Sequence, residues 1–284
     1  MSLPIQMSEN IAFYKAAPAE PKDNSSYLLL HGLGNSLDFW TDIAPELAQT
    51  RPTTAIDIPG FGRSATPPNG FTLDHISQAI GKFCDTSNIE DCVLIAHSLG
   101  TFIALNIAAQ APKRFKRLIL VDGTLTRAAE LIQDPKQAVK DPSLAVFVSA
   151  QFLGGMLPLR RRRASIISRT RIIRDLTMWP FVANPDSLNS DLLTAALADN
   201  SGRNVLKVLT EARSVRYEAL MSAISQPVDL VWGAKDRLIT RQDIQQARRH
   251  MNVKRELEIP DCGHWPMIEK PSTLIEFLLS FDSD

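Results

Sequence analysis

Short runs rich in valine, isoleucine and leucine recur along this chain, and stretches of helical character separate them. A continuously apolar strand is buried on both faces, and alternation of such strands with helices is typical of a parallel sheet. The expected strands are Ile11–Lys15, Tyr27–His31, Thr53–Asp57, Cys92–Ala96, Arg117–Val121, Val228–Trp232 and Glu256–Ile259. The expected helices are Leu37–Gln49, Leu73–Thr86, Leu99–Gln110, Arg241–His250 and Ser272–Phe281. This order predicts an α/β fold with a mostly parallel sheet and helices on both of its faces.

The alternation stops between Leu125 and Tyr217, where helical segments are interrupted by several prolines and no convincing strand occurs. Strand-like runs resume after this region, so we expect it to be an insertion within the sheet domain, placed as a lid would be. The predicted organisation is a first core part at 1–124, a helical cap at 125–217 and a second core part at 218–284.

The segment from Cys92 to Ala109 predicts a strand, a tight turn at Ser98 and an alanine-rich helix. A nucleophile elbow needs small residues two positions before and after the nucleophile, because strand and helix approach closely there. Those positions hold Ala96, where glycine is usual, and Gly100. The alternative is an ordinary strand-to-helix turn with a helix-capping serine.

The sequence His31-Gly-Leu-Gly34 directly follows an expected strand. In this position the Leu33 amide would point at a developing oxyanion, and the Leu99 amide would supply a second donor. A phosphate-binding GxGxxG loop is disfavoured because Leu37 stands where the third glycine would be.

Two further candidates follow late strands, Asp236 after Val228–Trp232 and His264 after Glu256–Ile259. A serine hydroxyl needs a base to take its proton, and the base needs an acid to orient it, so His264 and Asp236 fit these roles. Asp122 also ends a strand and is the alternative acid.

The order Ser98, Asp236, His264, together with His31-Gly32 and the loop Asp57-Ile-Pro-Gly-Phe-Gly-Arg-Ser64, resembles the α/β-hydrolase superfamily over nearly the whole chain. The resemblance implies an eight-stranded sheet with an inserted helical cap. Haloalkane dehalogenases and epoxide hydrolases have aspartate at the elbow, whereas the serine here implies acyl chemistry. Capped relatives of this kind include carboxylesterases, carbon–carbon bond hydrolases and the pimeloyl-acyl carrier protein methyl ester esterase.

The resulting functional hypothesis is a serine hydrolase that cleaves a carboxylic ester or thioester through an acyl-enzyme, with no metal and no organic cofactor. Hydrolysis of a carbon–carbon bond in a vinylogous diketone would use the same residues and is the second hypothesis. A non-catalytic receptor or scaffold on the same fold is the third.

Composition restricts the possible partners. Lysine plus arginine and aspartate plus glutamate number 31 each, so no overall field attracts nucleic acid. No apolar run approaches the ~18 to 20 residues that span a bilayer. The N-terminus lacks the features of a signal peptide, and Cys84, Cys92 and Cys262 form no disulfide pattern, so we expect a cytoplasmic protein.

The expected cap holds a cluster of arginines from Arg160 to Arg174 and several large apolar residues. Such a charge cluster is usually a solvated face, but arginine also matches the geometry of phosphate and carboxylate. The predicted partners are a small-molecule substrate and an anionic carrier such as acyl carrier protein at this cluster. The predicted substrate contacts are His97, Phe152, Met156, Trp179, Arg161 and Arg162. The alternative is packing for the first four residues and a solvated face for the two arginines.

Overall fold

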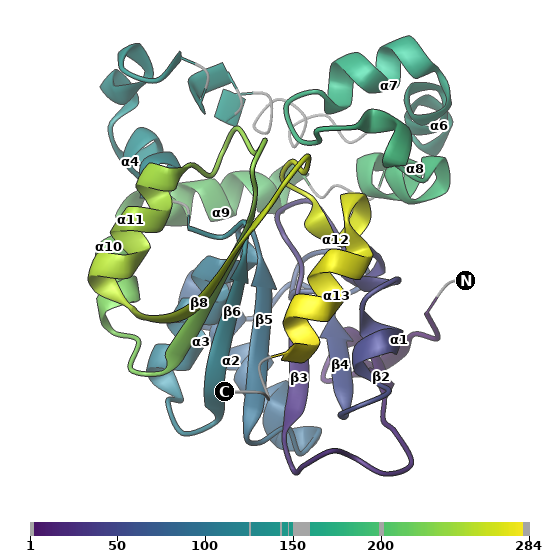
Figure 1. Cartoon of the computed structure of the whole chain (residues 1–284), viewed down its shortest axis with the longest axis vertical. Helices are drawn as coiled ribbons and strands as arrows, with labels where there is room; N and C mark the ends of the chain where they lie inside the picture. The colour runs from purple at the N-terminus through teal and green to yellow at the C-terminus, as the bar shows by residue number, and fades with distance from the viewer. Residues whose placement is uncertain are drawn as a thin grey trace.

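A computed structural model describes residues 3–124, 126–142, 144–146, 148–149, 160–198 and 202–280. Eight strands form one sheet in the order β1-β2-β4-β3-β5-β6-β7-β8 (Figure 1). They are β1 (Gln6–Ser8), β2 (Ile11–Ala16), β3 (Ser26–Leu30), β4 (Thr53–Ile56), β5 (Cys92–His97), β6 (Phe115–Val121), β7 (Pro227–Gly233) and β8 (Asn252–Ile259). The strands β4, β3, β5, β6, β7 and β8 are parallel to one another, and β1 and β2 add an antiparallel edge. The predicted α/β fold with a mostly parallel sheet is confirmed.

Side chains alternate between the two faces of the sheet, so each face has its own apolar layer. On β3, Leu28 and Leu30 enter one layer, whereas Tyr27 and Leu29 enter the other. The first layer is covered by α2 (Leu73–Thr86), α3 (Gly100–Gln110), α10 (Tyr217–Ser222) and α11 (Arg241–His250). The second layer is covered by η1 (Leu37–Trp40), α1 (Ala44–Leu47), α12 (Pro266–Glu269) and α13 (Pro271–Leu279). Burial on both faces explains the continuous apolar runs in the sequence.

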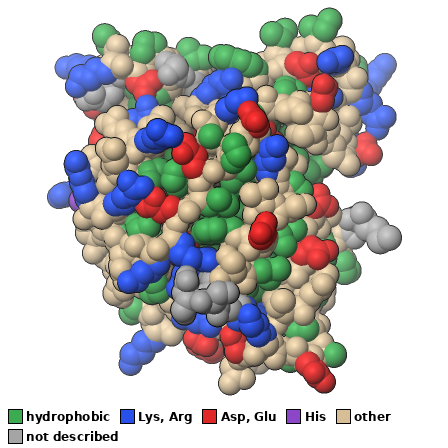
Figure 2. All heavy atoms as spheres, viewed as in Figure 1, with side chains coloured by type: hydrophobic (Ala, Val, Ile, Leu, Met, Phe, Trp, Pro, Cys, Tyr) green, Lys and Arg blue, Asp and Glu red, His purple; other side chains and the backbone are tan. Residues whose placement is uncertain are grey.

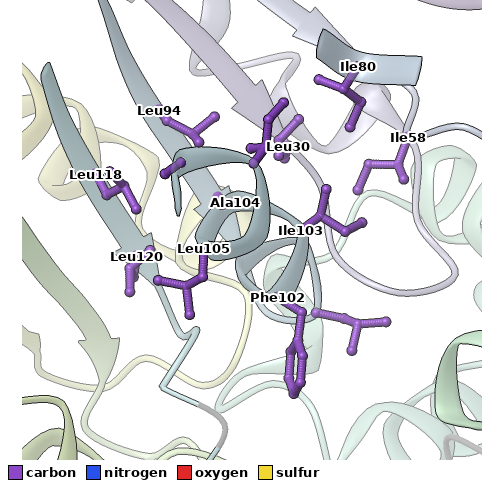
Figure 3. Close-up of a cluster of buried hydrophobic side chains, with 14 of the residues drawn as sticks. Leu30, Ile58, Ile80, Leu94, Phe102, Ile103, Ala104, Leu105, Leu118 and Leu120 are labelled. Carbon is purple, nitrogen blue, oxygen red and sulfur yellow. The ribbon is translucent and has the colours of Figure 1, made fainter. Parts of the chain in front are cut away.

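Helix α3 is buried from Gly100 to Ala108, which explains why its sequence lacks a polar stripe. Figure 3 shows Phe102, Ile103 and Leu105 on this helix within the cluster that also holds side chains of β5 and β6. The start of α3 is therefore fixed against the centre of the sheet.

The described residues between β6 and α10 form a series of helices, and Figure 1 shows these helices above the upper edge of the sheet. They are α4 (Thr126–Gln133), η2 (Pro135–Val139), α6 (Arg161–Arg169), α7 (Arg171–Met178), η3 (Pro185–Ser187), α8 (Ser190–Ala198) and α9 (Gly202–Ser214). Within the described ranges, no helix is long and apolar enough to cross a membrane.

Two of the differences from the sequence-based expectations have a clear local cause. Strand β1 was not predicted, because its three residues are largely exposed and present no apolar run. The expected helix Leu37–Gln49 is instead the short helix η1 followed by α1, which has Pro45 in its first turn. Proline lacks a backbone donor and disfavours helical conformation in the residue before it, so the helix cannot run through this point.

Candidate active site

Ser98 lies in the turn between β5 and α3 with a φ of 49°, in the left-handed region that non-glycine residues rarely adopt. Its amide donates to the carbonyl oxygen of Val121 on β6 at 3.0 Å. The turn also brings the backbone at Gly100 against β3. A Cβ atom at Gly100 would lie 2.4 Å from the carbonyl oxygen of His31, so only glycine fits there.

Ala96 occupies the position two before Ser98 and is completely buried in the apolar layer. Its side chain adds only one methyl group to that layer. The alanine is thus accommodated in β5 by ordinary packing, with the tight turn at Ser98 intact.

The structure brings together Ser98, His264 and Asp236, which are far apart in the sequence. The Nε2 atom of His264 lies 2.8 Å from Ser98 Oγ, and its Nδ1 atom lies 2.7 Å from Asp236 Oδ2. Asp236 and His264 follow β7 and β8, whose carboxyl ends lie at the same edge of the parallel sheet as that of β5. The His264 ring is 1% exposed, so this chain of contacts is shielded from solvent.

Asp122, the alternative acid, lies beside this chain of contacts. Its Oδ1 atom accepts a hydrogen bond from the Gly233 amide at 3.0 Å, and its Oδ2 atom is buried without a partner among the described residues. One ligand atom each from Asp122, Asp236 and His264 lies within 4.8 Å of the others. Asp236 therefore contacts the His264 ring directly, whereas Asp122 contacts the Gly233 amide and the side chain of Asp236.

The two carboxyl groups have opposite pKa shifts. Burial raises the pKa of Asp122 well above its ordinary value, and the nearby charge of Asp236 raises it further. Burial alone would also raise the pKa of Asp236, but the His264 ring outweighs burial and leaves that pKa lowered. Two negative charges at this separation repel strongly in a buried site, so Asp236 is the ionised member and Asp122 carries a proton.

The same three side chains have the residue types of a metal site. The His264 nitrogen that faces the carboxylates is already in hydrogen-bond contact with Asp236 at 2.7 Å. Because the hydrogen bond accounts for this short distance, the grouping needs no ion to explain it.

His97 precedes Ser98 but is buried behind it, at 1% exposure. Its Nε2 atom lies 2.8 Å from the carbonyl oxygen of His264, and burial lowers the pKa of His97 to about 3. The ring is therefore neutral and donates to that carbonyl. This placement supports the backbone of His264, and the predicted contact between His97 and a substrate stays a prediction.

The loop after β3 lies directly over Ser98. A Cβ atom at Gly32 would lie 3.1 Å from the Cβ atom of Ser98, so the chain passes very close to the serine just before Leu33. His31 holds this loop in place, since its Nε2 atom accepts from the Ile58 amide at 3.0 Å. In the described part of the chain, the amides of Leu33 and Leu99 donate to no other group.

The loop that carries His264 is attached to the helical segment between β6 and β7. The His264 amide donates to the carbonyl oxygen of Phe181 at 2.7 Å. Glu269 accepts from the Gly263 amide at 2.9 Å with one oxygen and from the Ala183 amide at 2.7 Å with the other. Sequence reasoning missed Glu269 and the role of the Phe181 carbonyl, because a backbone acceptor leaves no signal and one glutamate near a helix end is common.

The remaining predicted substrate contacts are dispersed. Trp179 is 58% exposed, and the guanidinium of Arg237 lies 4.3 Å from its ring centroid. Arg161 and Arg162 are exposed at the start of α6. Phe152 and Met156 lie outside the described residues, so the structure does not place them.

An apolar cavity lies at the start of α3, beside the turn that carries Ser98. Residues from α2, α3 and α9 enclose it, so it lies between the sheet domain and the helical segment. Its lining residues are Phe71, Leu73, Ile76, Leu99, Phe102, Ile103, Val208, Glu211 and Val215.

Comparison with known proteins gives consistent similarities. A family model described as "alpha/beta hydrolase fold" matches residues 28–146. The chain is 26% identical over 255 residues to the dihydrolipoyllysine-residue acetyltransferase component of the acetoin cleaving system of Pseudomonas putida, with 89% of this chain and 62% of that relative covered. It is 26% identical to the (lyso)-N-acylphosphatidylethanolamine lipase of Bos taurus, with 95% and 82% covered.

Among solved structures, a putative lipase of Acinetobacter baumannii superposes with a TM-score of 0.72 at 21% identity, covering 99% of this chain and 91% of that one. The chain thus spans less than two thirds of the first relative but most of the other two proteins.

Proposed function

Because this chain belongs to the α/β-hydrolase superfamily, we propose that it is a serine hydrolase that cleaves a carboxylic ester or thioester. The observation that carries the proposal is the chain of two contacts from Ser98 Oγ through His264 to Asp236, at 2.8 and 2.7 Å. This arrangement of hydroxyl, imidazole and carboxylate activates serine as a nucleophile on several unrelated folds.

In the proposed mechanism His264 Nε2 takes the proton of Ser98 as its oxygen attacks the substrate carbonyl carbon. Asp236 holds the proton on His264 Nδ1 and stabilises the imidazolium that forms. The protonated His264 then donates to the leaving alcohol or thiol, which departs and leaves an acyl group on Ser98. Water, deprotonated by His264, attacks this acyl-enzyme and releases the acid.

The tetrahedral intermediates carry a negative oxygen, for which we propose the Leu33 and Leu99 amides as donors. Three features of the site support this assignment. The Leu99 amide follows the nucleophile directly, the loop before Leu33 passes over Ser98, and neither amide donates elsewhere in the described chain.

We propose that residues 125–217 act as a cap over the candidate active site. Val208 and Glu211 of α9, and Val215 just after it, line the apolar cavity beside Leu99, so the helical segment packs against the start of α3. The lipases among the similar proteins support an ester substrate. We propose the cytoplasm as the compartment, in keeping with three buried free cysteines.

The proposal is tested with a fluorophosphonate, which reacts only with an activated serine. We expect labelling at Ser98, located by mass spectrometry of the digested protein, and no labelling of Ser98→Ala. Ser187→Ala, which removes an exposed hydroxyl, is the matched control and should label like the wild type. If the wild type stays unlabelled, the chain is a receptor or scaffold instead of a serine hydrolase.

Turnover then identifies the reaction. On p-nitrophenyl esters of increasing acyl length, we expect Ser98→Ala to lose on the order of 10⁶-fold in kcat. A vinylogous diketone is assayed beside the esters. Labelling at Ser98 with cleavage of the diketone alone would replace the ester assignment by carbon–carbon bond hydrolysis.

A further inference from the structure

Helix α7 presents an uncovered apolar stripe. Ile172 is 73% exposed, Leu176 is 74% exposed and Trp179, which caps the helix, is 58% exposed. Residues spaced by four and three positions lie on one face of a helix, so these side chains form a continuous strip. Met178 on another side of α7 is only 2% exposed and packs into the apolar layer below. The helix is therefore attached by one face and leaves a second apolar face in solvent.

The neighbouring helix α6 begins with three exposed arginines, Arg161, Arg162 and Arg163. The N-terminus of a helix carries a partial positive charge, so cations are unfavourable there, and the first turn of α6 contains no acidic residue. An anion bound at this turn would relieve the repulsion among the arginines and between them and the helix.

The acidic groups nearby are already engaged. Asp191 pairs with Arg169 on α6, and Asp175 and Asp186 pair with arginines of α7. Among the described residues, Arg161, Arg162 and Arg163 make no ion pair. Residues 160–198 contain seven arginines and three aspartates, whereas the chain as a whole has a net charge of +0. The positive charge is therefore a local property of this segment.

We propose that α6 and α7 together form a docking surface for an anionic lipid membrane, which we name the α6–α7 surface. The two helices pack against each other, so the arginines and the apolar stripe belong to one unit. Figure 2 shows hydrophobic side chains at the upper edge of the molecule, where Figure 1 places α7. A bilayer interface offers acyl chains to the stripe and anionic headgroups to the arginines.

An acidic protein is the rival partner, and the apolar stripe favours the membrane over it. Acidic side chains would satisfy the arginines but would leave Ile172 and Leu176 in water. Tryptophan is enriched at membrane interfaces, where its ring is apolar and its N–H meets water and headgroups. Trp179 at the end of the stripe fits this environment.

The α6–α7 surface is also connected to the candidate active site. Arg237, which follows Asp236 in sequence, donates to the carbonyl oxygen of Trp179 at 2.7 Å and stacks on its ring. Docking would therefore hold the site at a fixed position relative to the lipid. The binding itself needs no hydrolysis, so its test does not depend on the proposed function.

The distribution of tryptophans provides a direct probe. Trp40, Trp232 and Trp265 are buried, at 0%, 6% and 8% exposure, so a change in polarity at the surface is reported by Trp179. Intrinsic fluorescence is recorded while vesicles of equal parts phosphatidylglycerol and phosphatidylcholine are added, with pure phosphatidylcholine vesicles in parallel. We expect a blue shift with the anionic vesicles only, and co-sedimentation of the protein with them. Trp179→Phe should lose the shift and keep most of the binding.

Two sets of variants separate the charge from the apolar stripe. Changing Arg161, Arg162 and Arg163 to glutamine should weaken binding roughly 100-fold, because each basic residue near an anionic surface raises the affinity about fivefold. Its matched control changes Lys113, Arg249 and Lys254, three exposed cations on other elements, to glutamine and should bind like the wild type. Ile172→Ser with Leu176→Ser should weaken binding at least about 10-fold, whereas Met7→Ser, at an exposed apolar site on β1, should not.

Three results would overturn the proposal. The first is an absence of binding to anionic vesicles at low salt. The second is equal binding by the arginine variant and its control. The third is binding without a shift in Trp179 emission, together with arginine-dependent capture of polyglutamate, which would assign the surface to an acidic protein such as an acyl carrier.

Discussion

Replacement of Asp122 by asparagine probes the carboxyl group that shares the buried site with Asp236. Asparagine has nearly the same shape, and its oxygen still accepts from the Gly233 amide that Asp122 contacts at 3.0 Å. It cannot ionise. The substitution therefore isolates the cost of keeping a titratable group protonated in the folded protein.

The sign and size of the expected stability change follow from linkage between protonation and folding. Burial and the charge of Asp236 raise the pKa of Asp122 in the folded protein, whereas in the unfolded chain it ionises near its ordinary value of about 3.9. Above about pH 4 the unfolded state loses this proton and the folded state keeps it. Rising pH therefore destabilises the wild type by about 1.4 kcal/mol per pH unit through this one group, until the folded pKa is reached. The asparagine variant lacks this loss.

The assay is urea unfolding of both proteins at a series of pH values. We expect the free energy of unfolding of Asp122→Asn, relative to wild type, to rise by about 1.4 kcal/mol per pH unit above about pH 4, until the pH reaches the raised pKa of Asp122 in the folded protein. Asp42→Asn makes the same chemical change at an exposed site and should show a flat difference. If the difference in the free energy of unfolding between Asp122→Asn and wild type also does not change with pH, Asp122 is charged in the folded protein. The assignment of a proton to Asp122 would then be wrong.

Two further predictions concern the backbone around the site. Gly100→Ala places a Cβ atom 2.4 Å from the His31 carbonyl oxygen. It should lower the free energy of unfolding, measured in urea, by about 1–3 kcal/mol. Gly81→Ala, at an uncrowded site in α2, is the control and should not destabilise the protein. Glu269→Gln replaces one of two accepting oxygens with a donor that faces the amides of Gly263 or Ala183, so we expect a loss of about 1–3 kcal/mol in thermal unfolding and a lower kcat on esters. Unchanged stability and kcat in Glu269→Gln would show that this link is not needed to hold His264.

The parts of the site that depend on local sequence were predictable. The turn at Ser98 requires a small residue at Gly100, and that requirement is visible in a single segment. The convergence of Ser98, Asp236 and His264 follows from strand order, because parallel strands present their carboxyl ends at one edge of the sheet. The alternation of apolar runs and helices was sufficient to predict that sheet.

The sequence favours Asp236 as the acid but leaves Asp122 as an alternative. They follow β6 and β7, which are adjacent, so both reach the same region. Only the side-chain positions show that Asp236 lies 2.7 Å from His264, whereas Asp122 accepts a hydrogen bond from a backbone amide. Likewise, the exposed face of α7 depends on which side of the helix packs against the core, and residues on several sides of that helix are apolar.

The hydrogen bond from the His264 amide to Phe181 has a consequence for dynamics. It joins the imidazole-bearing loop to the chain that leads out of α7, and Glu269 adds a second link through Ala183. Coupling between two such parts is reciprocal in free energy. We therefore expect a ligand that orders His264 to slow hydrogen exchange at the amides of Ala183 and Asn184, both of which donate to Glu269.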